Sequence, residues 1–255
     1  MAGNTRRNIE LCFPELDVEA RERLVAESLE ETGRAMAEMG MSWLWSPARS
    51  LGKVRAVHGE SLIRDALDEG RGVLLIAPHL GNWEVLNLYV SNRYRPFTAM
   101  YKPPQLKLMD DLIRRRRARL GSAMAPANAS GVRMVMKALK RGEMVGILPD
   151  QEPDRQGDFR PFFGVQALTM KLLPQLARQT GARVICGYAK RLPGGEGFEL
   201  FFRAAEEGIG DPDLEKAAAA MNRSVEQCVR ALPAQYQWEY RRFSRRPRGE
   251  PKLYR

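Results

Sequence analysis

The residues best suited to chemistry in this sequence are His79 and Glu84, which lie close together in the segment Ala-Pro-His-Leu-Gly-Asn-Trp-Glu of residues 77–84. The apolar run Val-Leu-Leu-Ile-Ala of residues 73–77 is typical of a strand that is buried on both faces. Ligands of parallel α/β sheets bind beyond the carboxyl ends of the strands, so His79 lies where a site is expected. An imidazole at that place can act as a general base.

The spacing of the pair predicts how the two side chains could meet. On one continuous helix a step of five residues would leave them about 140° apart. We therefore expect His79 in a loop and a helix that begins near Gly81, so that the Glu84 carboxylate reaches back to one ring nitrogen. This contact would select one tautomer and leave the other nitrogen as the base, while backbone N–H groups at the helix start would attract an oxyanion. The residues also allow a simpler interpretation, a loop histidine that is hydrogen-bonded to nearby backbone.

Helical and strand patterns alternate along the chain after residue 60. Buried or alternating apolar runs predict strands at residues 73–77, 97–101, 144–148, 182–189 and 198–202. Helical spacing predicts helices at residues 61–69, 81–89, 106–120, 132–139, 168–180 and 213–231. The alternation predicts the α/β class, with residues 1–255 forming a single-domain sandwich whose mixed, largely parallel sheet is flanked by helices.

The N-terminal residues 17–46 have the apolar spacing of a long helix, for which Asp17 is a suitable N-cap. We expect this helical segment to pack on the domain. Its end, residues 36–45, is rich in Met and Trp. That composition favours either a face packed on the core or an interfacial face that contacts lipid.

Basic residues are concentrated in two parts of the chain, which has a formal net charge of +10. Residues 93–120 hold nine Lys and Arg against two Asp, and residues 241–255 hold seven against one Glu. Such segments favour nucleic acid, an anionic membrane or a phosphorylated lipid. No nucleic-acid-binding motif accompanies the charge, and no aromatic residues interrupt the arginine run of residues 114–119, so we expect no nucleic acid partner.

The remaining composition excludes several other classes. The three cysteines are widely spaced, which argues against a disulfide framework and fits a reducing compartment. No apolar run approaches the roughly 18–20 residues that span a bilayer, and the first residues lack a secretory pattern. His58, the only other histidine, has no setting comparable to that of His79, so no metal site is expected.

The segment His79-Leu-Gly-Asn-Trp-Glu84 resembles the H-x4-(D/E) motif of the glycerolipid acyltransferase superfamily. Its H-x-G-N-W-E form is similar to that of the late lipid A acyltransferases, the lauroyl- and myristoyltransferases of lipopolysaccharide biosynthesis. Further blocks follow in the order of that family, and the likeness covers nearly the whole chain. These blocks are Tyr101-Lys-Pro with Asp110 and Arg117-Ala-Arg119, then Arg141-Gly-Glu leading to Pro149-Asp150-Gln151, then Pro161-Phe-Phe-Gly, Met221-Asn222 and Tyr236-Gln-Trp238 with Arg241-Arg242-Phe243.

The resemblance implies a fold similar to that of glycerol-3-phosphate acyltransferase. It also implies an enzyme of lipid metabolism that moves a fatty acyl group from acyl-acyl carrier protein to a hydroxyl of a lipid A precursor. His79, with Glu84, would then remove the proton of the acceptor hydroxyl. The donor acyl group is carried on the phosphopantetheine of the carrier protein, and the resemblance implies no other cofactor and no metal.

The other site residues are carried over from the family's blocks. Arg117 matches a functional arginine of the family and could hold a phosphate of the acceptor or of phosphopantetheine, because a guanidinium binds phosphate in a bidentate manner. Asp150 matches the Pro-Asp aspartate and ends a predicted strand at the same edge as the histidine, although an ion pair to a nearby arginine is an alternative role. Arg119, Asn82 and Tyr101 are also expected to bind substrate.

The implied partners are acyl carrier protein, a phosphorylated glycolipid acceptor and the cytoplasmic face of the bacterial inner membrane. Members of the family usually carry a hydrophobic anchor ahead of the segment that residues 7–15 resemble, so the chain as it stands is expected to be peripheral. Two alternatives stay open. The acceptor could be another glycolipid, such as a phosphatidylinositol mannoside, or the chain could be a non-catalytic relative that binds lipid or carrier protein.

Overall fold

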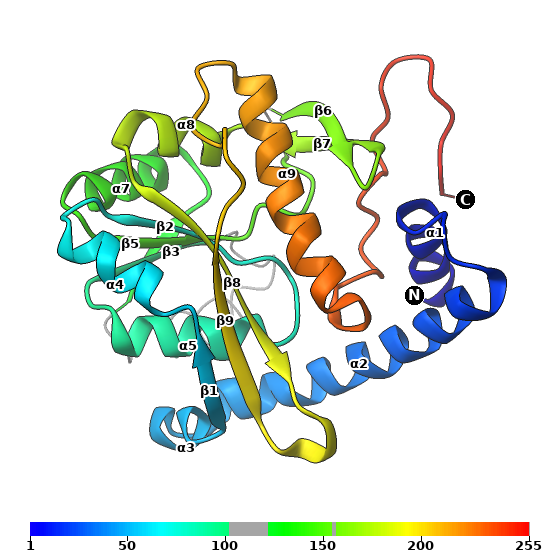
Figure 1. Cartoon of the computed structure of the whole chain (residues 1–255), viewed down its shortest axis with the longest axis horizontal. Coiled ribbons are helices and arrows are strands. Elements are labelled where there is room, and N and C mark those ends of the chain that lie inside the picture. The colour runs from blue at the N-terminus through cyan, green and yellow to red at the C-terminus, as the bar shows by residue number, and fades with distance from the viewer. Residues whose placement is uncertain (102–121, 155–156, 255) are drawn as a thin grey trace.

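The centre of the molecule is a seven-stranded sheet in the order β1-β9-β8-β2-β5-β3-β4 (Figure 1). The structure is a computed structural model that describes residues 1–101, 122–154 and 157–254. Neighbouring strands of the sheet are parallel apart from β8 and β9, which confirms the predicted α/β class with a mixed, largely parallel sheet. The strands are β1 (Val54–His58), β2 (Val73–Ile76), β3 (Phe97–Tyr101), β4 (Ala123–Pro126), β5 (Met144–Ile147), β8 (Arg183–Arg191) and β9 (Phe198–Ala204).

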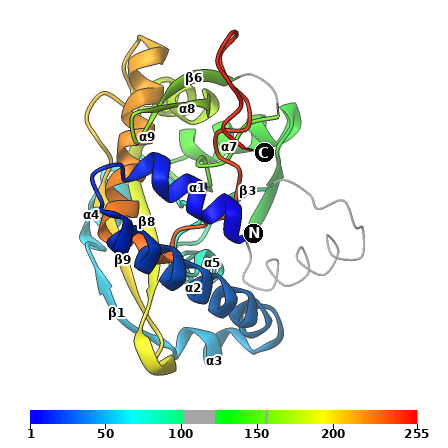
Figure 2. The same cartoon turned by 90° about the vertical axis from the view of Figure 1, so that its right-hand side faces the viewer.

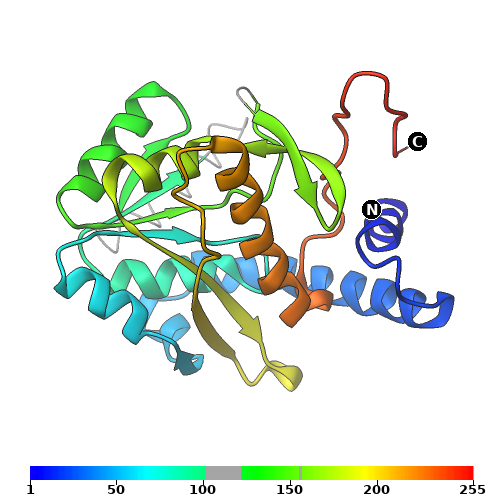
Figure 3. The same ribbon diagram turned by 45° about the horizontal axis from the view of Figure 1, so that its top comes forward.

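Helices cover both faces of this sheet (Figures 1 and 3). The reason is visible in β2, whose side chains alternate between two apolar clusters: Leu74 and Ile76 belong to one, Val73 and Leu75 to the other. A strand buried on both faces needs the continuous apolar sequence that residues 73–77 have. The first cluster packs under α7 (Ala129–Lys140), α8 (Leu172–Thr180) and α9 (Leu214–Ala231), and the second under α4 (Ser61–Asp68) and α5 (Trp83–Arg93).

The region before α8 differs from the prediction. The helix predicted for residues 168–180 is wrong at its beginning, because β6 (Gly157–Phe162) and β7 (Val165–Met170) form a separate antiparallel hairpin. Their two-residue turn, Phe163-Gly164, has positive φ at both positions, 50° and 77°. Such a turn matches the twist of paired strands and commits the following residues to a strand. The helix predicted for residues 106–120 lies outside the described residues.

The N-terminal segment forms α1 (Ala2–Cys12), α2 (Val18–Leu44) and α3 (Pro47–Leu51). As predicted, α2 begins after Asp17, whose side chain accepts a hydrogen bond from the Ala20 N–H at 2.7 Å. Figure 2 shows α1 close to the C-terminal segment, and Asn8 donates to the backbone oxygens of Trp238 and Tyr240 at 2.6 and 2.8 Å. Among the described residues, no helix combines the length and apolar character needed to cross a membrane.

Candidate active site

Two neighbouring strands bring His79 and Asp150 together at one edge of the sheet. β2 and β5 are parallel and in register at Ile76 and Ile147, so the segments that follow them leave the sheet side by side. Asp150 Oδ1 lies 3.0 Å from His79 Nδ1, and Asp150 Oδ2 accepts the backbone N–H of His79 at 2.9 Å. One carboxylate therefore holds both the ring and the backbone of the histidine, which fixes the direction of the imidazole.

The electrostatics of this pair keep the Asp150 carboxyl ionised. Asp150 is 4% exposed. Burial by itself raises the pKa of this carboxyl, but the charge of His79 and its ring and backbone hydrogen bonds outweigh burial and hold the pKa of Asp150 below its ordinary value. An ionised carboxylate accepts the proton of Nδ1–H, so in the neutral imidazole Nε2 is the nitrogen without a proton. Gln151 Nε2 lies 3.4 Å from His79 Nε2, and the histidine side chain is 17% exposed, so a substrate hydroxyl can reach the ring.

This geometry corrects one part of the sequence prediction. The carboxylate on the ring nitrogen was predicted to be that of Glu84, but Asp150 takes this place. The reason is that β2 and β5 are parallel and in register, which brings the segment after β5 beside the ring, whereas Glu84 lies in the first turn of α5. Glu84 does occupy the first turn of α5, as predicted, and is 7% exposed. A role for Glu84 in the reaction stays a prediction.

The turn that carries His79 is held by backbone contacts from two distant segments. Gly81 has a φ of 64°, and a Cβ at this position would lie 2.0 Å from the backbone oxygen of Ala189, so only glycine fits. The Gly81 N–H donates to the Gln235 backbone oxygen at 2.9 Å, and the Gln237 N–H donates to the His79 backbone oxygen at 3.0 Å. The Tyr236-Gln-Trp238 block thus supports the turn of the histidine.

Asn82 begins α5, and its amide is engaged on both sides by the protein. Its Oδ1 caps the helix by accepting the Val85 N–H at 3.0 Å, and its Nδ2 donates to Glu38 Oε2 at 2.9 Å. Its own N–H donates to Ala189 O at 2.9 Å. Because the N–H groups of Gly81, Asn82 and Val85 already have acceptors, the prediction that they offer an oxyanion site is wrong for these three.

Of the other predicted site residues, the structure describes Tyr101. Tyr101 is half-buried at the end of β3, and its backbone oxygen accepts the Ala127 N–H at 2.9 Å. Since β3 is parallel to β5, Tyr101 leaves the sheet at the same edge as Asp150. Arg117 and Arg119 lie outside the described residues, and their predicted roles stay predictions.

Residues 2–245 match the model of a family described as bacterial lipid A biosynthesis acyltransferase. The chain belongs to this family. It is 36% identical to the lipid A biosynthesis lauroyltransferase of Escherichia coli (strain K12) over 97% of this chain and 80% of that protein. The palmitoleoyltransferase of the same strain is also 36% identical, over 98% of this chain and 80% of its own. A lipid A biosynthesis acyltransferase of Haemophilus influenzae is 30% identical over 99% of this chain and 81% of that protein. The protein is therefore an acyltransferase of lipid A biosynthesis.

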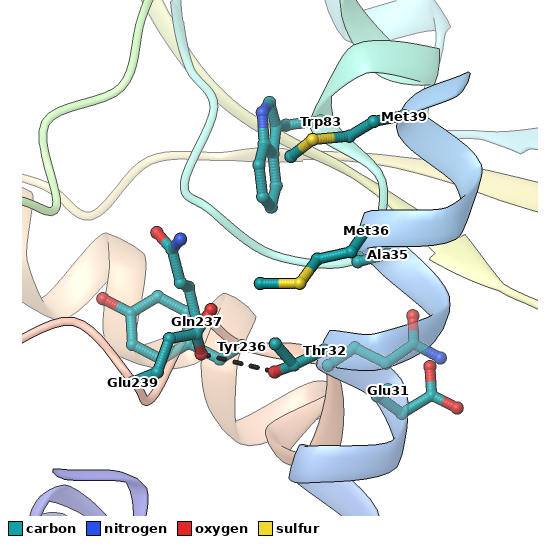
Figure 4. A pocket seen from close by; sticks show the side chains of 11 residues that line it. Glu31, Thr32, Ala35, Met36, Met39, Trp83, Tyr236, Gln237 and Glu239 are labelled. Carbon is teal, nitrogen blue, oxygen red and sulfur yellow. Dashed lines mark hydrogen bonds between the residues drawn. The ribbon is translucent and has the colours of Figure 1, made fainter. Parts of the chain in front are cut away.

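The acyltransferase has a small pocket beside the turn of His79, between α2 and the loop of residues 235–239 (Figure 4). Its volume is about 50 Å³, and Met36, Met39 and Trp83 form its apolar side. The Trp83 and His79 rings contact each other in a T-shaped arrangement, with 5.1 Å between the ring centroids and an interplanar angle of 65°. Met36 is 52% exposed. The apolar surface of the pocket therefore continues from solvent to the histidine ring.

Several residues that support the site were not selected from the sequence. Gln151 donates to Gln237 Oε1 at 3.0 Å and so connects the segment after β5 to the C-terminal block. Tyr236 is buried, and burial together with the nearby Asp150 carboxylate raises the pKa of Tyr236. Gln151, Tyr236 and Gln237 stand inside blocks that resemble the family, which was the available signal. Their residue types alone carried no chemical reason to select them.

Proposed function

We propose that this acyltransferase moves a fatty acyl group from acyl-acyl carrier protein to a hydroxyl of a lipid A precursor, with His79 as the general base. The observation that carries the proposal is the Asp150–His79 contact at the sheet edge of a member of this family. The names of the Escherichia coli relatives, a lauroyltransferase and a palmitoleoyltransferase of lipid A biosynthesis, support a fatty acyl group as the one transferred.

The proposed reaction transfers the acyl group directly from the thioester sulfur of the donor to the hydroxyl oxygen of the acceptor. His79 Nε2 takes the proton of the acceptor hydroxyl while its oxygen attacks the thioester carbonyl. The new C–O bond forms, the C–S bond breaks, and the imidazolium returns its proton to the leaving thiolate. Asp150 stabilises the imidazolium between these two proton transfers, as the carboxylate of a catalytic triad does. The step needs no covalent enzyme intermediate.

The acyl chain of the donor is proposed to lie against Met36, Met39 and Trp83. A pocket of about 50 Å³ is comparable with one or two water molecules, each of which takes about 30 Å³ in the liquid. The chain would therefore run along the mouth of the pocket, over the exposed Met36. Methionine side chains suit this role because they are flexible and polarisable.

The charged ends of both substrates are proposed to bind basic residues. Residues 241–255 hold seven Lys and Arg against one Glu, which favours an acidic carrier protein. Arg117 and Arg119 are proposed to hold phosphate groups of the acceptor or of phosphopantetheine. Phosphorylated glycolipid and carrier protein would then approach a positively charged part of the enzyme.

The site of action is proposed to be the cytoplasmic face of the inner membrane, where the acceptor is anchored. Residues 39–59 contain Arg49, Lys53 and Arg55 and no Asp or Glu. Leu44, at the end of α2, is 66% exposed. Exposed apolar side chains beside basic ones favour the surface of an anionic bilayer, and this stretch supports a peripheral attachment next to the pocket.

An acyl-transfer assay tests the proposal. Acyl carrier proteins loaded with different chain lengths are offered with a panel of lipid A precursors and a phosphatidylinositol mannoside, and products are measured by mass spectrometry. We expect the wild-type protein to acylate a lipid A precursor and His79→Ala to lose transfer. His58→Ala is the matched control, since His58 is 49% exposed on β1, which lies three strands away from β2 in the sheet. Near wild-type turnover by His79→Ala would contradict the mechanism, and transfer to the mannoside alone would favour the other acceptor.

A further variant pair tests the phosphate-binding role. Arg117→Ala is expected to lose much more activity than Arg114→Ala, because only Arg117 matches the arginine of the family block. Small and equal losses would show that Arg117 is ordinary surface charge.

A further inference from the structure

An arginine at the end of β8 is buried against two carboxylates of α2. The Arg191 side chain is 4% exposed. Its guanidinium binds Glu38 through two bonds of 2.6 and 2.8 Å and binds Glu31 through one bond of 2.6 Å. A buried ion pair of this kind is weak evidence for stability, because the cost of removing the charges from water offsets much of their attraction. Its presence next to the turn of His79 therefore calls for another role.

The two carboxylates differ in what else they contact. Glu38 Oε2 also accepts the Nδ2 hydrogen of Asn82 at 2.9 Å, whereas Glu31 is bound by Arg34, on the same helix, at 2.5 Å. Asn82 is 6% exposed, and its other amide atom caps α5. Of the two carboxylates, Glu38 is thus the one that connects Arg191 to the turn that carries the histidine.

The backbone of the same arginine reaches this turn by a second route. The Arg191 N–H donates to Gln235 Oε1 at 2.9 Å, and Gln235 Nε2 donates back to the Arg191 oxygen at 3.0 Å. The Gln235 backbone oxygen in turn accepts the Gly81 N–H. Glu38 also stands beside Met39 on α2, so the helical turn that is tied to Arg191 is the one that presents the pocket methionines (Figure 4).

We propose that Glu38, Arg191 and Asn82 form a positioning network for acyl transfer. The network sets the direction of the turn from His79 to Glu84 and keeps the Met36 and Met39 side of α2 over the histidine. Asn82 is then a positioning residue and not a ligand of the substrate. This inference rests on the proposed function for its kinetic test, and a second measurement on the histidine itself is independent of the substrate.

The kinetic test compares Glu38→Ala with Glu31→Ala. Each variant leaves Arg191 with one carboxylate, but only the first removes the contact to Asn82. We expect Glu38→Ala to lower kcat about 10- to 100-fold and Glu31→Ala to lower it less than about 3-fold, at similar midpoints of urea unfolding. An equal decrease of kcat in the two variants, or a decrease of kcat that parallels the decrease of the unfolding midpoint, would overturn the proposal.

A double-mutant cycle tests the link between Glu38 and Asn82. Asn82→Ser keeps a side-chain oxygen that can cap α5 but is too short to bind Glu38. We expect the double variant Glu38→Ala/Asn82→Ser to be no slower than the slower single variant, since each single change already breaks the same Asn82–Glu38 hydrogen bond. Multiplied losses in the double variant would show that the two residues act separately.

The substrate-independent test uses ring signals in ¹H–¹⁵N NMR spectra. The chain has two histidines, so the His58→Ala variant assigns the signals of His79. Glu38→Ala should shift the His79 ring signals and Glu31→Ala should leave them in place. If the wild-type protein acylates no lipid A precursor, the proposed function fails, while this spectrum still decides on the network. Unchanged His79 signals in Glu38→Ala would overturn it.

Discussion

Replacement of Asp150 by Asn should remove the base without removing the fold. Asn has nearly the same shape as Asp, but only one of its two terminal atoms is an acceptor. In the structure both carboxylate oxygens accept, one from the His79 backbone N–H at 2.9 Å and one from Nδ1 at 3.0 Å. The single amide oxygen of the Asp150→Asn variant cannot serve both. If it stays on the backbone N–H, the NH₂ group faces Nδ1 and the imidazole must carry its proton on Nε2.

The expected loss of activity follows from this change of tautomer. With the proton on Nε2, the nitrogen that faces the acceptor hydroxyl can no longer take its proton. The comparable change in a serine-protease triad lowers kcat by about 10⁴-fold. We expect Asp150→Asn to lower kcat by about 10³- to 10⁴-fold, which corresponds to about 4–5.5 kcal/mol of transition-state stabilisation.

The assay measures acyl transfer from a donor of one acyl chain length by mass spectrometry. The tautomer of His79 is measured by ¹H–¹⁵N NMR on the same variants. The wild-type protein should show the Nδ1–H tautomer of His79 and Asp150→Asn the Nε2–H tautomer. Glu84→Gln is the matched comparison, since the sequence alone pointed to that carboxylate. If Asp150→Asn keeps more than a tenth of the wild-type kcat and Glu84→Gln alone changes the tautomer, Asp150 is not the partner of the base.

Three further predictions concern stability and the pocket. Gly81→Ala should lower the free energy of unfolding by more than about 2 kcal/mol in urea titrations, because its φ is positive and the new Cβ meets Ala189 O; an unchanged midpoint would contradict the geometry of the turn. The Asp150 carboxyl has a lowered pKa in the folded protein, so its contribution to stability is present above its ordinary pKa and is lost as the pH falls through the folded value. The unfolding free energy of the wild-type protein should therefore exceed that of Asp150→Asn by about 1–3 kcal/mol at pH 5–8, and the difference should shrink below about pH 4. A difference that grows on acidification would contradict the lowered pKa of Asp150. Met39→Trp should reduce transfer of the longest acyl chains most, and Met134→Trp, at an exposed position on α7, is its control. An equal loss at every acyl chain length would show that the acyl chain does not lie against Met39.

Much of the fold was predictable because its signals are local. The run of residues 73–77 has the composition of a strand buried on both sides, and β2 forms there. Asp17 offered an N-cap before a helical apolar pattern, and α2 begins behind it. The β6–β7 hairpin was missed because β7 and α8 follow each other without a strong break, so a single apolar segment was interpreted as one helix. Its decisive signal is the Phe163-Gly164 turn, which is specific only once the strands are known to pair.

The candidate site was also predictable only in part. The position of His79 at a strand end, and of Asp150 at the same edge, followed from the order of apolar runs and family blocks. Which carboxylate meets the ring did not follow, because Glu84 was five residues away and Asp150 is 71 residues away. Sequence separation favours the nearer residue, whereas the register of two parallel strands favours the farther one.

The sequence by itself determined that this chain is an α/β acyltransferase of the lipid A family with a histidine suited to act as a base, since residue types, their spacing and the ordered blocks are all properties of the chain. Only the tertiary structure decided the partner of that histidine and what holds it in place. Glu38 and Arg191 are 153 residues apart and carry no shared motif. They meet because α2 lies across the end of β8, and a contact between elements so distant depends on how they pack, which no local pattern of residues records.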